Sequence, residues 1–473
     1  MLEREYRREM DAMTLTAEQK EKLVDVMTGA ARAPRAIRAG RTVLVAAAVC
    51  AVLAASALAY VTGALDFLKG REEYQFLGQA ALYEDCAQRV DLSATADNGD
   101  TLTIEYTAMD ENFCTVFYTL RTVQPMEAWS QREHLSISPD APDLWQAMGL
   151  EPSFILEADG EVLTGGQDGQ QYLLDANTLV GMARLPLNRA GALADGENVT
   201  LREEVPLTDW DGVSDREEAG WWSFTLTAQP MEAQTYILSA PASLGERQVE
   251  SLSVTISPLG TVLRARVTVP EEYRAEPDLW GGLGWFVVRD EDGRYYPYDA
   301  LTSALSEDGT AWEESYILYG LEDAETLELL PAELDGEFVT VGLEDLPWQG
   351  EGGYTFASFT VEEGQMTLRL EPDGVVGSTG YCGSVAYFLR REAAPDELPQ
   401  GFREDESEKL FYGDGAPDIY QNSYTDWRDG SVTITWSLDK AAQAQAEELA
   451  GLELYVETYV PQEGTGVLLT LTK

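Results

Sequence analysis

A run of twenty residues without a charge, from Thr42 to Val61, constrains this chain more than any other feature. A helix rises about 1.5 Å per residue, so a run of this length can cross a hydrocarbon core about 30 Å thick. The run therefore predicts a transmembrane helix over residues 42–64. It separates a short segment, residues 1–41, from a much larger C-terminal region.

The charges next to this run predict its orientation. Four arginines directly precede it, whereas Lys69 and Arg71 follow it among acidic residues. Segments rich in Lys and Arg stay on the cytoplasmic side of a membrane. We therefore expect a single-pass protein of a bacterial cell membrane, with a cytoplasmic N-terminus and an extracellular C-terminal region. The residues that set this topology are Arg32, Arg35, Arg38 and Arg41.

A cleaved signal peptide is the alternative interpretation of the same run. Ala57-Leu58-Ala59 has the small-residue pattern of a cleavage site directly before Tyr60. The segment before the run is long for the charged region of a signal peptide, and the run itself exceeds the usual apolar region. The sequence therefore favours an anchor, and cleavage between Ala59 and Tyr60 stays open.

The net charge is distributed very unevenly. Residues 1–41 carry nine Lys or Arg against seven Asp or Glu, whereas the whole chain carries −51. The region after the apolar run therefore carries −53. Binding to nucleic acid needs a dense cationic surface, so this balance predicts no nucleic-acid partner. It suits an exposed extracellular region whose ligand the sequence does not identify.

Residues 1–41 have the pattern of two short amphipathic helices. Apolar residues recur at helical spacing in each of them. Helices this short are marginal alone and usually need a partner surface or a membrane. The residues that we expect to contact a cytoplasmic partner are Tyr6, Met10, Met13, Leu23 and Met27.

Beyond the apolar run, residues 65–90 look helical, and the pattern then changes to the period of two that is typical of strands. Three strand–turn–strand patterns predict hairpins. The paired segments are 102–106 with 115–120, 251–256 with 261–269, and 358–361 with 366–370. Many short strands between turns predict a mainly β fold of tandem antiparallel β-sandwich domains of immunoglobulin-like type.

An internal repeat supports a division into domains. The sequence APDLW at 141–145 returns as EPDLW at 276–280. A strand, a turn and a second strand follow each copy, at 152–163 and at 284–296. This duplication predicts related units. We expect β-sandwich domains at 91–242 and 246–346, and a third β domain at 350–473.

Motifs for catalysis or metal binding are not found in the sequence. Its one histidine, His134, is not accompanied by a nucleophile motif, and no pair of Cys or His residues has zinc-ligand spacing. The acidic turns Asp290-Glu291-Asp292-Gly293 and Gly413-Asp414-Gly415 fit turn chemistry better than a calcium site. We therefore expect a protein that is not an enzyme and that holds no cofactor or metal.

Cysteine and tryptophan leave two questions open. Of the cysteines outside the apolar run, Cys86 and Cys114 could form a disulfide, which would leave Cys382 over. Trp221 and Trp222 are adjacent, and neighbouring residues on a strand face opposite sides. One of them is therefore expected to point outward, as a platform for a sugar or a partner protein. Filling of the core explains most other tryptophans better.

The segment from Tyr83 to Leu120 resembles the start of the domain-of-unknown-function (4179) ectodomain of a family of Gram-positive single-pass membrane proteins. Six residues fit the family pattern, which is a segment of the form Y-x-x-x-A-x-x-V followed by a D-x-G turn, a strand and a D-x-x turn. The N-terminal sequences YRREMDAM and LTAEQKEKLVDVM also resemble this family, as does SVTISPLGTVLRARV, so that the resemblance covers roughly residues 1–270. The six matching residues are Tyr83, Ala87, Val90, Asp97, Gly99 and Asp110.

The resemblance implies an anti-sigma-factor-like regulator beside an extracytoplasmic-function sigma factor. Residues 1–41 contain no His or Cys, so the zinc-binding type of anti-sigma factor is excluded and only a helical peptide contact is possible. The sequence thus predicts an extracellular sensor or binding region joined to a short cytoplasmic segment. The alternative is a surface module that binds glycans or proteins and has no signalling role.

Overall fold

The computed structural model divides the chain into two units, Met1–Phe67 and Leu68–Lys473. All described residues belong to the second unit. They are residues 83, 86–96, 98–123, 152–164, 167–188, 193–203, 222–276, 281–321, 324–350, 353–362, 365–379, 384–390, 409–410, 420–426, 428–437, 446 and 449–471.

Several predicted features lie outside these ranges. They include the apolar run, the arginines before it and the five partner-contact residues of the N-terminal segment. Within the described ranges, no helix is both long enough and apolar enough to span a bilayer. The helix predicted over 65–90 is described only at its end, where the Ala87 amide donates to the Tyr83 carbonyl at 2.8 Å. It ends before Gln88, because a strand begins there.

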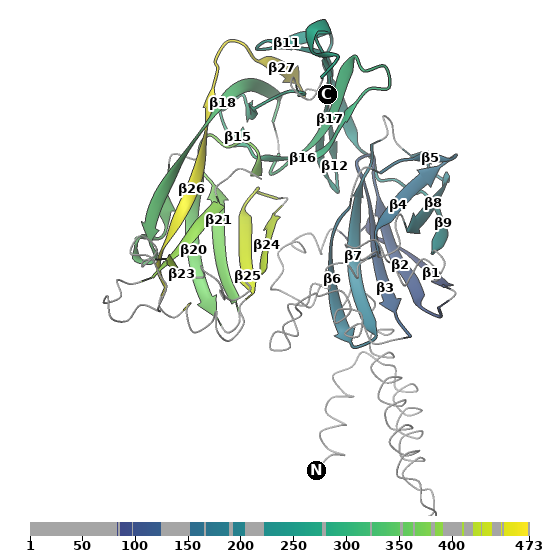
Figure 1. The fold of residues 1–473 in the computed structure, drawn as a ribbon. Helices are drawn as coiled ribbons and strands as arrows, with labels where there is room; N and C mark the ends of the chain where they lie inside the picture. Colours follow the sequence, from purple (N-terminus) through teal and green to yellow (C-terminus); the bar gives the residue numbers. More distant parts are fainter. Residues whose placement is uncertain are drawn as a thin grey trace, which may run out of the picture. The chain divides into compact units, whose positions relative to one another are not determined.

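The described part of the chain is mainly β, and its strands form antiparallel sheets (Figure 1). Three of these sheets, which we name A1, A2 and A3, share one strand order. Sheet A1 runs β1 (Gln88–Thr95), β2 (Thr101–Met109), β3 (Phe113–Arg121), β7 (Thr178–Pro186), β6 (Asp168–Asp175). Sheet A2 runs β10 (Gln234–Ile237), β12 (Arg247–Ser257), β13 (Gly260–Thr268), β17 (Ala311–Leu318), β16 (Tyr298–Leu305), with β11 (Ala242–Leu244) beside β12. Sheet A3 runs β19 (Trp348–Gln349), β20 (Tyr354–Glu362), β21 (Gln365–Pro372), β25 (Val432–Ser437), β24 (Tyr420–Thr425).

Two further sheets, B1 and B2, complete the set. Sheet B1 runs β5 (Glu161–Val162), β4 (Phe154–Ala158), β8 (Asn198–Glu203), β9 (Ser223–Thr227). Sheet B2 runs β15 (Tyr295–Tyr296), β14 (Phe286–Asp290), β18 (Thr326–Gly342), β26 (Leu449–Pro461), β22 (Ser384–Arg390), β23 (Lys409–Leu410), with β27 (Val467–Thr470) beside β18.

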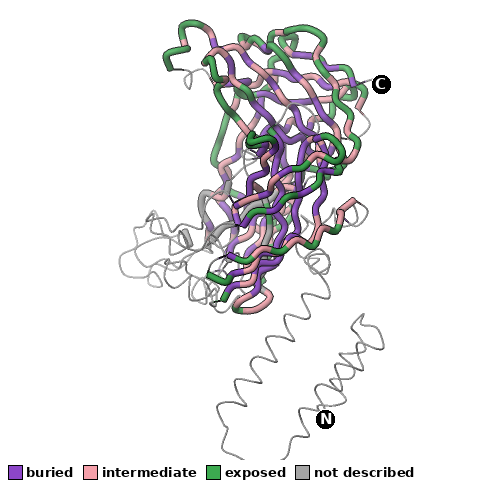
Figure 2. Tube along the Cα trace, turned by 90° about the vertical axis from the view of Figure 1, so that its right-hand side faces the viewer, coloured by how far each residue is buried: buried purple, intermediate pink, exposed green. Residues whose placement is uncertain are grey.

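The three predicted hairpins are confirmed as β2–β3, β12–β13 and β20–β21. In β2, apolar and polar residues alternate, and the apolar Leu102 and Ile104 are fully buried in the core. The residues of β3 are buried on both faces except at its end, so both faces of this strand are covered by other parts of the protein. Figure 2 shows such stretches of buried residues along the strands.

Three hydrophobic cores join the A sheets to the B sheets. The first core combines Val116 of sheet A1 with Leu156 and Leu201 of sheet B1. The second combines residues of sheet A2 with the β14, β18 and β27 part of sheet B2, and the third combines sheet A3 with the β18, β22 and β26 part. We name the three sets repeats 1, 2 and 3. The internal repeat of the sequence is thus present three times in the strand order.

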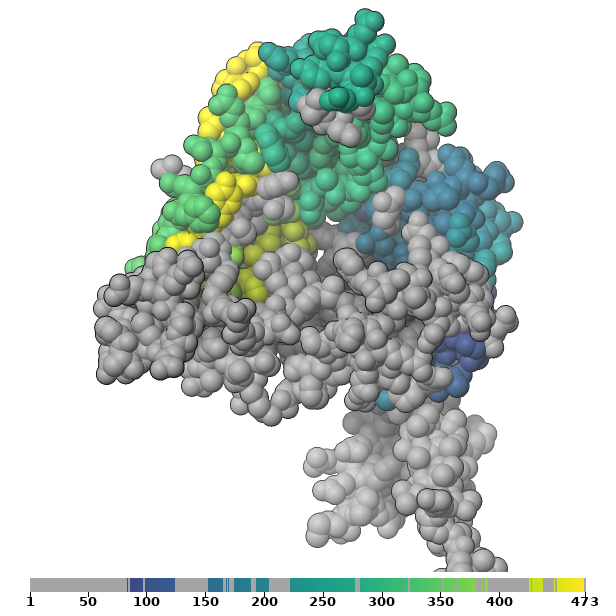
Figure 3. Space-filling model, in the orientation of Figure 1, coloured from purple at the N-terminus to yellow at the C-terminus, as the bar shows by residue number. Residues whose placement is uncertain are grey.

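Strand β18 belongs to two repeats. Its first part pairs with β14 and β27, and its second part, from Ala332 to Gly342, pairs with β26. After β26 the chain returns to repeat 2, where Val467 and Leu469 of β27 are buried in the second core. Repeat 2 therefore contains β27, which follows repeat 3 in the sequence, and repeat 3 contains the second part of β18, which begins in repeat 2. Figure 3 shows the C-terminal residues, in yellow, beside the green residues of β18.

The pairing of the strands differs from the domain boundaries that we expected from the sequence. Strand β10 lies in the range 91–242 expected for the first domain, yet it pairs with β12 of sheet A2, as does β11, which begins at the last residue of that range. Strand β27 lies in the range 350–473 expected for the third, yet it pairs with β18 in repeat 2. The boundaries of the repeats are set by hydrogen bonds between strands that are distant in sequence. Turn patterns in the sequence do not reveal these pairings.

A buried polar junction joins repeat 1 to repeat 2. The Asn112 amide nitrogen, in the β2–β3 turn, donates to the carbonyls of Thr255 and Gly260, both at 2.9 Å. The Arg184 guanidinium donates to the Leu259 carbonyl at 2.5 Å and lies 3.5 Å from the Phe113 ring centroid. Any Cβ at Gly260 would come within 2.7 Å of this guanidinium, so the close approach requires glycine. The two turns therefore meet through side chains of repeat 1.

Candidate functional site

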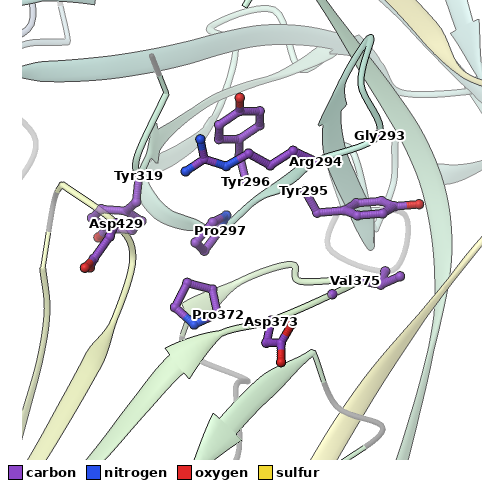
Figure 4. Close-up of a pocket in the computed structure, with 11 residues that line it drawn as sticks. Gly293, Arg294, Tyr295, Tyr296, Pro297, Tyr319, Pro372, Asp373, Val375 and Asp429 are labelled. Carbon is purple, nitrogen blue, oxygen red and sulfur yellow. The ribbon is translucent and has the colours of Figure 1, made fainter. Parts of the chain in front are cut away.

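A pocket of about 340 Å³ lies where turns of repeat 2 meet turns of repeat 3 (Figure 4). Repeat 2 contributes the β14–β15 hairpin and the ends of the strands that follow it. Repeat 3 contributes the end of β21 and the β24–β25 turn. The lining residues are Gly293, Arg294, Tyr295, Tyr296, Pro297, Tyr319, Pro372, Asp373, Gly374, Val375 and Asp429.

Asp290 fixes the β14–β15 turn at one side of the pocket. Its Oδ1 accepts hydrogen bonds from the amides of Asp292 at 3.0 Å and Arg294 at 2.9 Å. Its Oδ2 accepts from the Tyr296 hydroxyl at 2.7 Å. Gly293 completes the turn at φ +80°, a conformation that favours glycine. Hydrogen bonds within the turn thus account for Asp290, which agrees with the interpretation of this segment as a turn.

The neighbouring carboxylate, Glu291, also has protein partners. It accepts hydrogen bonds from the amides of Glu325 and Thr326, at 3.0 and 2.9 Å. These bonds lower the pKa of Glu291 to about 2. No group of three or more metal-binding side chains is found in the described ranges. The other acidic turn, Gly413–Gly415, lies outside them.

Aromatic and proline side chains form the apolar wall of the pocket. Tyr296, Pro297 and Tyr319 are buried, and the Tyr319 amide donates to the Pro297 carbonyl at 2.9 Å. Burial and the hydrogen bond to Asp290 raise the pKa of Tyr296. This phenol therefore stays neutral at physiological pH. It offers a ring face instead of a charge.

The opposite wall of the pocket is formed by residues 372–375, and hydrogen bonds hold this segment in place. Asp373 Oδ2 accepts from Gln349 Nε2 at 2.5 Å and from the Thr355 hydroxyl at 3.1 Å. Farther along, the Gly377 carbonyl accepts from the Tyr298 amide at 3.1 Å. This wall is thereby attached to both repeats.

The β24–β25 turn closes a third side. Asp429 Oδ1 accepts from the Ser431 amide at 2.8 Å, which holds the turn. Gly430 adopts φ +74° and packs directly against Pro297, since a Cβ at this position would overlap Pro297 Cγ. The turn of repeat 3 therefore touches the wall supplied by repeat 2.

Arg294 supplies the positive charge of the lining. Its guanidinium carbon lies 5.2 Å from the centroid of the Tyr296 ring. Figure 4 shows this guanidinium beside the Tyr296 ring and across the pocket from Asp373. The lining thus combines ring faces, a planar hydrogen-bond donor and two carboxylates. These groups can bind a polar ligand that has an apolar face.

Of the residues that the sequence predicted for a site, the described ranges contain only Trp222, which does not line the pocket. Trp222 is buried in the first core at 3% exposure, and its Nε1 donates to the Asp100 carbonyl at 3.4 Å. It therefore presents no face to a ligand, whereas Trp221 and His134 lie outside the described residues. Cys86 and Cys114 form no disulfide with each other. Burial raises the pKa of the Cys114 thiol to about 12.

The sequence did not predict this pocket. Of the segment GRYYP, from Gly293 to Pro297, Gly293 was noted in an acidic turn and residues 293–296 as the end of a repeated hairpin. This segment places an arginine, two tyrosines and a proline directly after a turn, and that cluster could have indicated a binding site. The lining from repeat 3 could not be inferred, because it lies about 80 to 130 residues away along the chain.

Comparisons with known proteins give little further information. No family model matches this chain, and no curated protein matches it. Among solved structures, the crystal structure of the conserved domain protein from Bacillus anthracis is similar over 54% of this chain and 83% of that one. The sequence identity is 17% and the TM-score is 0.36.

Proposed function

We propose that this chain is a single-pass envelope protein whose β-rich region binds a ligand outside the cell. The apolar run Thr42–Val61, with the arginines before it and the strong acidity after it, supports this topology. The lipid bilayer is then one partner, and the bacterial cell membrane is the location. The N-terminus lies in the cytoplasm.

We propose further that each repeat is an antiparallel β-sandwich of immunoglobulin-like type. The common strand order of sheets A1, A2 and A3 supports this architecture, as does the core that each shares with a B sheet. Turns gather at the ends of such domains, and binding sites are commonly built there.

The pocket is the observation that carries the binding function. Its walls come from two repeats, and its ring faces, guanidinium and carboxylates suit recognition of a polar ring-shaped ligand. A saccharide fits this description, because a sugar ring has an apolar face and a hydroxylated edge. The proposed activity is binding without chemical conversion.

Saturation-transfer NMR on the full chain in detergent tests this proposal with cellotriose, triacetylchitotriose and a hyaluronan tetrasaccharide. We expect at least one of the three to bind. Val375→Trp, which fills the pocket, should abolish that binding. Val162→Trp, an equal change at an exposed position of β5, should leave it intact. If none of the three binds, or if both variants bind normally, the pocket function is wrong.

The leading form of this proposal is a sensor. Residues 1–41 would contact a cytoplasmic partner, namely an extracytoplasmic-function sigma factor, as the family resemblance implies. The amphipathic pattern of Tyr6, Met10, Met13, Leu23 and Met27 supports such a contact. Co-purification from cells tests it: a sigma factor should accompany the full chain and be lost when residues 2–30 are deleted.

The alternative is a surface-binding protein without a signalling role. It shares the pocket and the membrane anchor, and it differs only in the cytoplasmic segment. Recovery of the pocket ligand without any sigma factor would favour this alternative. Recovery of both would favour the sensor.

A further inference from the structure

Arg294 differs from most described arginines in its surroundings. The chain has 83 Asp and Glu residues against 32 Lys and Arg, so carboxylate partners are abundant. Ion pairs are present for Arg89, Arg202, Arg266, Arg289, Arg369 and Arg428. For the Arg294 guanidinium, by contrast, no ion pair or hydrogen bond to another described residue is found, although it lines the pocket.

The backbone of Arg294 is nevertheless held in place, while its side chain is exposed at the pocket. Its amide is held by Asp290 Oδ1 at 2.9 Å, and its side chain lies against the ring of Tyr296. The same Asp290 carboxylate holds the Tyr296 hydroxyl. One turn therefore holds both the backbone of Arg294 and the ring beside its side chain. A planar guanidinium can donate two parallel hydrogen bonds to a carboxylate.

The two carboxylates of the lining are engaged by other groups. Asp373 accepts from Gln349 and Thr355, and Asp429 accepts from the Ser431 amide. Neither forms an ion pair with Arg294. Figure 4 shows Asp373 on the wall opposite the guanidinium. The side of the pocket at Arg294 is thus suited to an anionic group of a ligand.

The size of the acidic charge does not prevent this contact. Salt screens charges over about 8 Å at physiological ionic strength, so a ligand carboxylate at Arg294 is affected mainly by its neighbours. A densely charged polymer would meet the acidic surface over its whole length. A short ligand with a single carboxylate avoids most of that repulsion.

We propose that the pocket recognises an acidic saccharide, with Arg294 bound to the sugar carboxylate and the tyrosine and proline wall against the sugar ring. This inference rests on the proposed binding function and adds the class of its ligand. Arg294 acts as the residue that distinguishes an acidic sugar from a neutral one.

Two sugars that differ only at one carbon test this inference. Methyl β-glucuronide carries a carboxylate where methyl β-glucoside carries a hydroxymethyl group. We expect the full chain to bind the glucuronide at least about tenfold more tightly in an NMR titration, the range of one good charge-assisted contact. Arg294→Gln should remove this preference, and Arg294→Lys should keep part of it.

Arg266→Gln is the matched control, because Arg266 pairs with Glu250 and Glu313 on sheet A2 outside the pocket lining. This variant should keep the full preference. Equal affinity for the two sugars, or an unchanged preference in Arg294→Gln, would overturn the inference while the binding function stands. Binding of acetyl-Ala-Ala-Ala in place of the glucuronide would also overturn it. No binding of any saccharide in either experiment would overturn the binding function itself.

Discussion

The amide of Leu259 donates a hydrogen bond of 2.8 Å to Asp110 Oδ2, across 149 residues of sequence. The other oxygen of this fully buried carboxylate accepts from the amides of Asn112 and Phe113, both at 2.8 Å. One side chain thus closes its own β2–β3 turn and holds the β12–β13 turn of the next repeat. Two predicted turns thereby become one junction.

Replacing this carboxylate should destabilise the junction. Asp110→Ala removes the acceptor of three amides, and each buried amide without a partner costs about 1–3 kcal/mol. We expect the free energy of unfolding to fall by at least about 3 kcal/mol in urea denaturation. Glu111→Ala, at the half-buried neighbour in the same turn, removes a 3.3 Å acceptor of the Thr235 hydroxyl and should change it by less than about 1 kcal/mol. Equal effects of the two substitutions would contradict this account.

The last strand of the chain should stabilise repeat 2. Leu469 of β27 is buried in the second core, whereas the adjacent Leu468 is 59% exposed. Leu469→Ala should therefore reduce the free energy of unfolding by about 2–4 kcal/mol, and Leu468→Ala should have little effect. Hydrogen exchange should locate the loss in β14 and in residues 326–329 of β18. These segments would remain unaffected if the C-terminus belonged to repeat 3 alone.

Stability should depend on the ionisation of Glu291. Its pKa in the folded protein is lowered to about 2, first by the Glu325 amide, whereas an unfolded glutamate has a pKa of about 4.3. Its stabilising effect is therefore complete above pH 4.3 and is lost as the pH falls towards about 2. Glu291→Gln should make the melting temperature fall less between pH 5 and pH 2.5. Glu307→Gln, an exposed control, should leave the wild-type slope, and a parallel shift of both variants would refute the prediction.

Gly430 offers a test of the pocket wall. Gly430→Ala places a side chain at positive φ and against Pro297, whereas Gly464→Ala has a similar φ and open space around it. Both should lose about 1–2 kcal/mol of stability from backbone strain. Only Gly430→Ala should also weaken saccharide binding, because it must displace Pro297. Equal binding by the two variants would show that Pro297 does not shape the ligand site.

The sequence was sufficient to predict the three hairpins. Alternating apolar residues and turn residues identified all three hairpins, because these signals depend on neighbours only a few residues apart. The APDLW and EPDLW repeat indicated related units, although their common strand order extends to a third.

Long-range relationships were beyond these patterns. The pairing of β18 with both β26 and β27, and the meeting of Pro297 with Gly430, depend on the tertiary fold. Trp222 illustrates the same limit, because period-two alternation shows that one of two neighbours faces inward but does not show which. The pocket was missed for this reason: its walls come from segments that are distant in sequence.

Hydrogen–deuterium exchange on the full chain tests the central claim, a saccharide site between repeats 2 and 3, most directly. The measurement compares the chain alone with the chain saturated with methyl β-glucuronide. We expect slower exchange at residues 293–297 and 372–375, and unchanged exchange in β2 and β3 of repeat 1. Protection confined to repeat 1, or no protection of the two pocket segments at saturation, would contradict the account.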